Sequence, residues 1–175
     1  MFSIIVMMIF DAVENTFKIL EEKGITREFL YGNAEQKDGF NIPLEEVCQQ
    51  LGIKVDYVAN LKDEKYGFLI SGTSDAKKKI IKINSSENEK RQLFTLGHEL
   101  YHVLNNQSMN RSEDMICNED KKANSFSAEL LMPHDYLLKI YIQKNGDINE
   151  IAKYFKVSTQ ALGFKLLNDG IIVSI

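Results

Sequence analysis

The fold is decided by one stretch of the chain, Phe94-Thr95-Leu96-Gly97-His98-Glu99-Leu100-Tyr101-His102-Val103-Leu104. The polar segment before it predicts that Ser85 or Ser86 caps a helix of about 20 residues that runs to Asn105. Residues four apart on an α-helix project from the same face, so His98 and His102 can reach one metal ion. Their apolar neighbours indicate that the helix packs against a core.

The spacing of His98, Glu99 and His102 carries a specific chemistry. Neutral imidazole nitrogens are good zinc ligands, and a catalytic zinc site takes three protein ligands and leaves a fourth position for water. Glu99, beside the first ligand, can take a proton from that water as general base, while zinc polarises the scissile carbonyl group. With only three histidines in the chain, this H-E-x-x-H pattern is expected by chance on the order of 0.004 times. It therefore predicts a zinc-dependent peptidase.

A third zinc ligand has to come from another segment. In peptidases of the thermolysin type, which share the H-E-x-x-H pattern, this ligand is an acidic residue on the next helix, predicted here over residues 118–132. We favour Asp120, because Asn124 lies one turn later on the same face and can hydrogen-bond one of the ligands. Glu119 and Glu129 remain alternative ligands.

His134 is the remaining histidine. It follows Pro133, which cannot continue the preceding helix, so we interpret it as the first residue of the next helix rather than as a ligand. From there it can also donate a hydrogen bond to a transition-state oxyanion.

The rest of the chain predicts helices and one small sheet. We expect further helices over residues 11–23, 26–31, 43–52 and 134–143. Residues 32–41 carry turn-forming residues without periodicity, which indicates a loop. Alternating apolar residues predict strands at 53–57, 66–70 and 79–83, which we interpret as a three-stranded antiparallel sheet.

The C-terminal segment, residues 146–175, is predicted to form a helix-turn-helix-like unit separate from a metallopeptidase domain over residues 1–145. Ser158 is expected to cap its second helix, and residues 170–175 to form a short strand like that of a winged helix. Lys165 is the only cation of the second helix, so we expect weak affinity for nucleic acid phosphates. Substrate docking or structural support is the preferred role.

Composition limits the other classes. A formal charge of −4 gives no global attraction for a polyanion, and 44% hydrophobic with 26% charged residues is typical of a soluble globular protein. The only cysteines, Cys48 and Cys117, are expected to stay unpaired in a reducing cytoplasm. Residues 1–10 are apolar but lack a basic start and a cleavage site, so we interpret them as a buried strand or helix start rather than a signal or membrane span.

Three blocks in order resemble the ImmA/IrrE family of metallo-endopeptidases. They are Ile80-Ile81-Lys82-Ile83-Asn84-Ser85-Ser86, Arg91-Gln92-Leu93-Phe94-Thr95-Leu96-Gly97-His98-Glu99-Leu100-Tyr101-His102, and Ala123-Asn124-Ser125-Phe126-Ser127-Ala128-Glu129-Leu130-Leu131-Met132-Pro133. The resemblance covers about residues 40–140 and is more specific than the five-residue motif alone. Family members typically have Gly at the position of Tyr101 and often Glu at that of Asp120.

The resemblance implies a small α+β zincin-like domain with the sheet packed along the active-site helix. It also implies narrow proteolysis of a helix-turn-helix transcriptional repressor, as in induction of phages and mobile elements or in a stress response. Two rival hypotheses are a DNA-binding or toxin-antitoxin-type regulator with a structural metal, and a peptidase-like toxin or stress regulator with another target.

Overall fold

The computed structural model describes residues 16–36, 39–105 and 113–173, with side chains in 113–117 left aside. The chain divides into two compact units, Pro43–Ser127 and Met1–Ile42 together with Ala128–Ile175. Both helices and strands are present, as the α+β prediction requires. The predictions for residues 1–15 and for the side chain of Cys117 lie outside the described part. The functional boundary expected at residue 145 stays a prediction.

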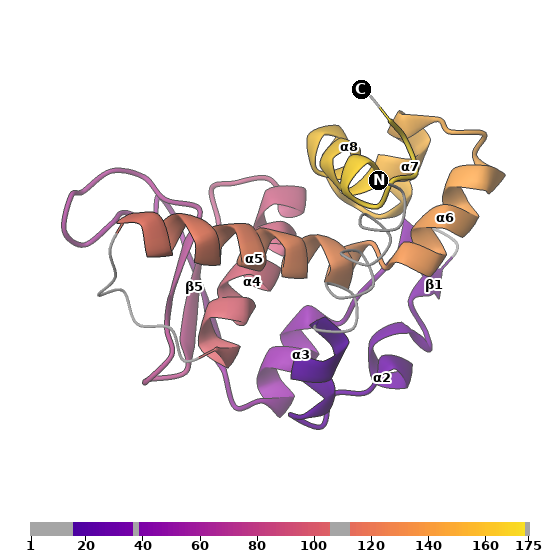
Figure 1. Ribbon diagram of the computed structural model, residues 1–175. Helices are drawn as coiled ribbons and strands as arrows, with labels where there is room; N and C mark the ends of the chain where they lie inside the picture. Colours follow the sequence, from indigo (N-terminus) through magenta and orange to yellow (C-terminus); the bar gives the residue numbers. More distant parts are fainter. Residues whose placement is uncertain (1–15, 37–38, 106–112, 174–175) are drawn as a thin grey trace. The chain divides into compact units, whose positions relative to one another are not determined.

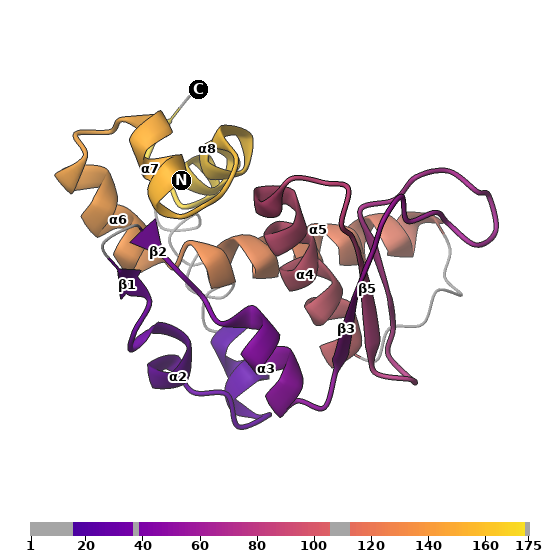
Figure 2. The same cartoon turned by 180° about the vertical axis from the view of Figure 1, so that it is seen from behind.

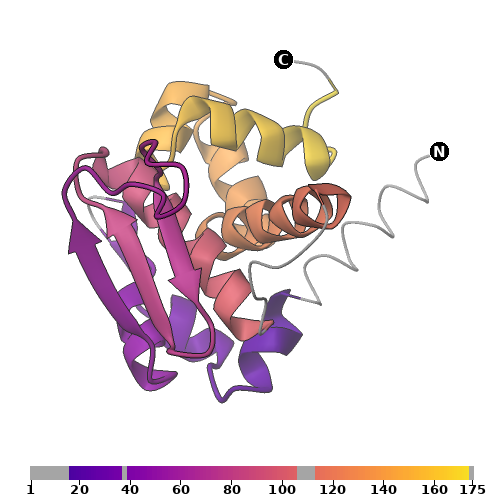
Figure 3. The same cartoon turned by 90° about the vertical axis from the view of Figure 1, so that its left-hand side faces the viewer.

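The unit Pro43–Ser127 contains a three-stranded sheet in the order β3 (Lys54–Val58), β5 (Ile80–Asn84), β4 (Gly72–Asp75), seen side by side in Figure 3. β5 is antiparallel to β4 but parallel to β3, so the predicted all-antiparallel sheet is wrong. The most apolar strand, with fully buried Ile81 and Ile83, takes the centre and pairs on both sides. The tight turn between β4 and β5 makes these two strands antiparallel. The longer β3–β4 connection allows β3 to lie parallel to β5.

The predicted strand at 66–70 is also wrong. Residues 61–70 form a short turn-containing loop, here called the tip hairpin, with one bridge between Lys62 and Leu69. The Asp63 carboxylate accepts hydrogen bonds from two backbone N–H groups inside the turn, and Gly67 has a φ of 71°. Such local bonding competes with a strand ladder. The strand forms instead at the polar stretch that becomes β4.

The histidine helix is α4 (Glu89–Leu104), which packs against β4, β5 and α3 (Leu44–Gln50); α3, α4 and the sheet are seen from behind in Figure 2. Its N-cap is Asn88, not the predicted Ser85 or Ser86. The reason is local, because the Ser86 hydroxyl already accepts a hydrogen bond from the backbone N–H of Asn60.

Helix α5 (Glu113–Leu131) begins before the predicted residue 118 and lies close to α4 (Figure 1). A Cβ atom on Gly97 would lie 2.6 Å from Ser127 Oγ and 3.1 Å from Ser127 Cβ. The Ser127 hydroxyl donates a hydrogen bond to the Phe94 carbonyl at 2.8 Å. The missing side chain at Gly97 therefore permits the two helices to approach closely.

The second unit is mostly helical. Its elements after residue 21 are α2 (Arg27–Tyr31), β1 (Glu35–Gln36), β2 (Gly39–Phe40), the last part of α5, α6 (His134–Gln143), α7 (Ile148–Tyr154) and α8 (Thr159–Asn168). The β1–β2 pair replaces part of the predicted loop. Phe40 is buried among the rings of Tyr31, Tyr136 and Phe155.

The helices α6 to α8 follow the sequence predictions closely. Ser158 caps α8 by accepting a hydrogen bond from the Ala161 N–H at 3.1 Å. Residues 171–173 form no strand, so the predicted terminal strand is absent from the described part of this segment. None of the helices that the structure describes has both the length and the apolar composition needed to cross a bilayer.

Gly97→Ala should lower the free energy of unfolding. Overpacking a tight contact costs about 1–3 kcal/mol, while replacing a helical glycine by alanine returns up to about 1 kcal/mol. We expect a net loss of up to about 2 kcal/mol in urea denaturation. The same change in a Ser127→Gly background should cost much less, as a double-mutant cycle would show. A Gly97→Ala protein more stable than the parent would contradict the close helix contact.

Candidate metal centre

Three potential metal ligands meet where α4 and α5 pack together. His98 and His102 come from one face of α4, and Asp120 comes from α5. Their ligand atoms lie within 4.8 Å of one another. Among the described residues, these three form the group of histidine and acidic side chains that could hold a metal ion. The sequence thus placed all three residues on the candidate list, and the fold brings them together.

The distances in this group suit a tetrahedral ion. His98 Nε2 lies 3.1 Å from His102 Nε2, and Asp120 Oδ1 lies 3.4 Å from His102 Nε2 and 3.8 Å from His98 Nε2. A tetrahedron with ligands about 2.1 Å from the metal has edges of about 3.4 Å. Two imidazoles and one carboxylate, with a corner left open, are a donor set that zinc uses in catalytic sites. The residues present therefore fit zinc.

Asn124 fixes the orientation of the first histidine. Its Oδ1 atom lies 2.9 Å from His98 Nδ1. Because an amide oxygen only accepts hydrogen bonds, we assign the proton of the neutral ring to Nδ1, which leaves the lone pair of Nε2 directed at the ligand group. Such contacts orient metal-binding histidines and raise their basicity.

Glu99 lies beside the ligands on α4 and is 9% exposed. The Ser74 hydroxyl, from β4, donates a hydrogen bond to Glu99 Oε2 at 2.7 Å. This contact holds one oxygen of the Glu99 carboxylate in place. Sequence reasoning missed Ser74, because it lies in the polar stretch between the strands predicted at 66–70 and 79–83.

Gly72 is the signal that could have revealed the position of β4. A Cβ atom there would lie 2.5 Å from Thr95 Cγ2 and 3.3 Å from Glu99 Cγ. A glycine inside a strand often marks a close approach of two segments. Here it brings β4 against the helix that carries Glu99.

The first alternative ligand has other partners. Glu119 accepts a hydrogen bond from the Tyr101 hydroxyl at 3.4 Å and pairs with Lys122 at 2.9 Å. Tyr101 stands where family members typically have Gly, and its ring contacts those of His102 and Phe126. The Tyr101 ring therefore packs between α4 and α5, and its hydroxyl donates a hydrogen bond to Glu119.

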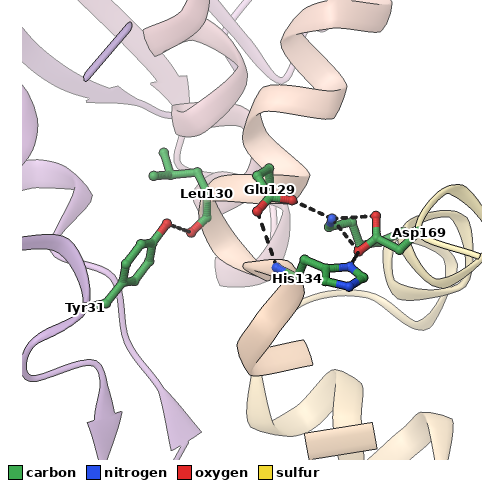
Figure 4. A network of polar contacts seen from close by, with 6 residues as sticks. Tyr31, Glu129, Leu130, His134 and Asp169 are labelled. Atoms are coloured by element: carbon green, nitrogen blue, oxygen red, sulfur yellow. Dashed lines mark hydrogen bonds and ion pairs between the residues drawn. The ribbon is translucent and has the colours of Figure 1, made fainter. Parts of the chain in front are cut away.

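The second alternative ligand, Glu129, belongs to a polar cluster in the other unit (Figure 4). Lys165 Nζ lies 2.6 Å from a carboxylate oxygen of Glu129 and 2.6 Å from one of Asp169. Burial raises the pKa of Glu129, and the Lys165 ammonium group opposes that rise. Glu129 is thus held as the partner of a buried lysine.

His134 joins the same cluster. Its Nδ1 atom lies 3.0 Å from Asp169 Oδ2, and its backbone N–H donates to Glu129 Oε1 at 3.3 Å. Nearby, the Tyr31 hydroxyl donates to the Leu130 carbonyl (Figure 4). The ring is therefore positioned by Asp169, and a role in transition-state stabilisation stays a prediction.

The cluster also bears on the C-terminal helix pair. Lys165 is the only cation of α8, and its side chain is 6% exposed and paired with two carboxylates. A helix that reads DNA needs exposed cations to contact phosphates. The described surface of α8 offers none.

The site contains two histidines one turn apart, a carboxylate that completes the ligand triangle and a second carboxylate beside them. This set of residues is typical of a metallopeptidase centre. A family model agrees: the chain belongs to the family described as IrrE N-terminal-like domain, Peptidase M78, whose model matches residues 48–167.

The fold is also similar to a solved structure, a Mycobacterium tuberculosis transcriptional regulator, with a TM-score of 0.61 and 16% sequence identity. The match covers 90% of this chain and 46% of the regulator, so the chain spans about half the length of that protein. No curated protein matches the chain significantly.

Asp120→Ala should weaken zinc binding more than Glu119→Ala does. Asp120 completes the ligand triangle, whereas Glu119 bonds Tyr101 and Lys122. Because loss of a mere supporting partner typically costs 10- to 100-fold in metal affinity, we expect a loss above about 100-fold for Asp120→Ala and below about 10-fold for Glu119→Ala. Competition with a chelating dye measures both. A larger loss for Glu119→Ala would reverse the ligand assignment.

Lys165→Met should destabilise the protein by about 3–5 kcal/mol at neutral pH, because two buried carboxylates lose their counter-ion. The folded-state pKa of Glu129 is already raised, and removal of Lys165 raises it further. A raised carboxyl pKa favours the protonated folded state, so stability is lost as pH rises through that pKa.

The Lys165→Met deficit should therefore shrink as pH falls toward 5. Urea denaturation across this pH range measures it, with Lys153→Met, at an exposed position of α7, as the matched control. A deficit that grows on acidification would contradict this account of the cluster.

Proposed function

We propose that the protein is a zinc-dependent endopeptidase. The observation that carries this proposal is the triangle of His98, His102 and Asp120 with Glu99 directly beside it on α4. The side chain of Asp120 is 49% exposed, against 20% and 17% for the two histidines. The ligand group is therefore reached from solvent on the Asp120 side, as a site that takes a polypeptide requires.

The residues divide the hydrolysis between them. Zinc held by His98, His102 and Asp120 would polarise the scissile carbonyl group and lower the pKa of the attacking water. Glu99 accepts a proton from that water as its oxygen bonds to the carbonyl carbon. It then delivers the proton to the amide nitrogen as the C–N bond breaks, so the leaving group departs as an amine. Ser74 keeps the carboxylate oriented in both steps.

The substrate is expected to bind along β4. This strand lies at the edge of the sheet within the described part of the chain, and its Ser74 contacts the catalytic carboxylate. An extended peptide can add to such an edge through main-chain hydrogen bonds, which give affinity without demanding a particular sequence. Pairing with β4 would bring a peptide bond next to Glu99.

The preferred substrate is a helix-turn-helix transcriptional repressor, and the cytoplasm is the preferred location. The support for the repressor is the family resemblance alone. The α7–α8 segment is proposed to dock the substrate or to support the catalytic unit, because buried Lys165 leaves α8 without a phosphate-binding cation. This also argues against a DNA-binding regulator with a structural metal.

Glu99→Gln should leave zinc bound and the fold intact while turnover falls by about 10²- to 10⁴-fold, or about 3 to 5 kcal/mol of transition-state stabilisation. The amide is nearly isosteric with the carboxylate but cannot accept the proton. Co-expression with candidate repressors encoded nearby, followed by mass spectrometry of fragments, measures the loss.

The matched control is Glu89→Gln, in the first turn of the same helix, which should cleave like the parent. A Glu99→Gln protein that cleaves at the parent rate with unchanged zinc content would exclude Glu99 as the base. The inactive variant should also retain its uncleaved substrate, which makes it a trap for the partner.

A further inference from the structure

The tip hairpin carries a cluster of large apolar side chains in water. Tyr66, Phe68 and Leu69 are 67%, 56% and 61% exposed. The rings of Tyr66 and Phe68 stack with centroids 6.0 Å apart and planes 10° from parallel. Scattered exposed apolar residues are ordinary, but adjacent ones that form a patch often mark a site that binds another molecule.

The hairpin backbone holds this patch in a defined conformation. Backbone hydrogen bonds join Asp63 N–H to the Phe68 carbonyl at 2.9 Å and Ile70 N–H to the Leu61 carbonyl at 3.0 Å. The buried Asn84 side chain donates to the Ile70 carbonyl at 3.0 Å, which fixes the hairpin to the end of β5. The hairpin is therefore preorganised, and a ligand that binds the apolar side chains does not have to pay the entropy of ordering the hairpin backbone.

The hairpin leads directly into the proposed substrate edge. Only Ser71 separates it from β4, which begins at Gly72 and contacts Glu99 through Ser74. A peptide antiparallel to β4, the sense that β5 already uses, would place its C-terminal side toward Gly72. An extended peptide advances about 3.4 Å per residue. The bound peptide would therefore pass the Gly72 end of β4 within a few residues of the cut bond. The hairpin is the next surface along this path.

We infer that Tyr66, Phe68 and Leu69 form a subsite for large apolar side chains of the substrate, located a few residues C-terminal to the cleaved bond. This inference rests on the proposed peptidase function and adds a substrate class to it. The preferred substrate is a polypeptide with an extended segment that carries Phe, Leu or similar residues just after the cut.

Binding tests the subsite without requiring catalysis. The probes are two labelled peptides that share a neutral Ser-Ala sequence, and only one of them carries a Phe-Leu pair. Their affinities for the Glu99→Gln protein are measured by fluorescence anisotropy. We expect preference for the Phe-Leu peptide and a loss of at least about tenfold in its affinity on Tyr66→Ser, Phe68→Ser and Leu69→Ser together. These side chains are exposed and the backbone bonds remain, so zinc content and melting should not change.

The matched control replaces Leu138 and Ile142, exposed apolar residues of α6, by serine, and should bind like the parent. Phe68→Ser alone gives the same test with a smaller change. Equal binding by hairpin variant and control, or no preference for the Phe-Leu peptide, would overturn the subsite.

Cleavage of a proteome-derived peptide library by the parent protein tests the polarity. Apolar residues should be enriched on the C-terminal side of the cut, and this enrichment should vanish in the hairpin variant. Enrichment on the N-terminal side alone would also overturn the inference. Hairpin-dependent binding without any cleavage would instead leave the subsite standing and refute the peptidase function.

Discussion

The close approach of α4 and α5 at Gly97 is the constraint on which the metal centre depends. Two histidines one turn apart supply only two corners of a tetrahedron. The third corner and the amide that orients His98 both come from α5, at Asp120 and Asn124, and their reach is short. A side chain at Gly97 would meet Ser127. The glycine at this position is therefore part of what builds the site.

The sequence was most informative where chemistry and local periodicity coincide. His98, Glu99 and His102 were selected from their spacing on one helix, and Asp120 was favoured over Glu119 and Glu129 because Asn124 lies four residues later. The structure brings His98, His102 and Asp120 together. The sheet was less predictable, because strand pairing joins distant segments. The polar stretch that forms β4 has no apolar alternation, and its position depends on the contact of Gly72 with α4. The Ser74–Glu99 contact could not be foreseen without it.

Lys165 shows a second limit of sequence reasoning. In the sequence it is a cation on a helix that resembles a recognition helix. In the structure it is buried between Asp169, four residues away, and Glu129, 36 residues away. The sequence predicted weak phosphate binding from a shortage of charge, and the burial of Lys165 between two carboxylates adds a second reason for that prediction. Burial removes the one cation that α8 has.

Tyr101 gives the metal centre an optical property. The chain has seven tyrosines and no tryptophan, so its intrinsic fluorescence comes from tyrosine and is not masked by transfer to indole. The ring of Tyr101 has its centroid 5.8 Å from that of His102. A paramagnetic ion such as Co²⁺ in the ligand triangle would quench a ring at that range. The unlabelled protein thus contains its own emitter for titrating metal occupancy.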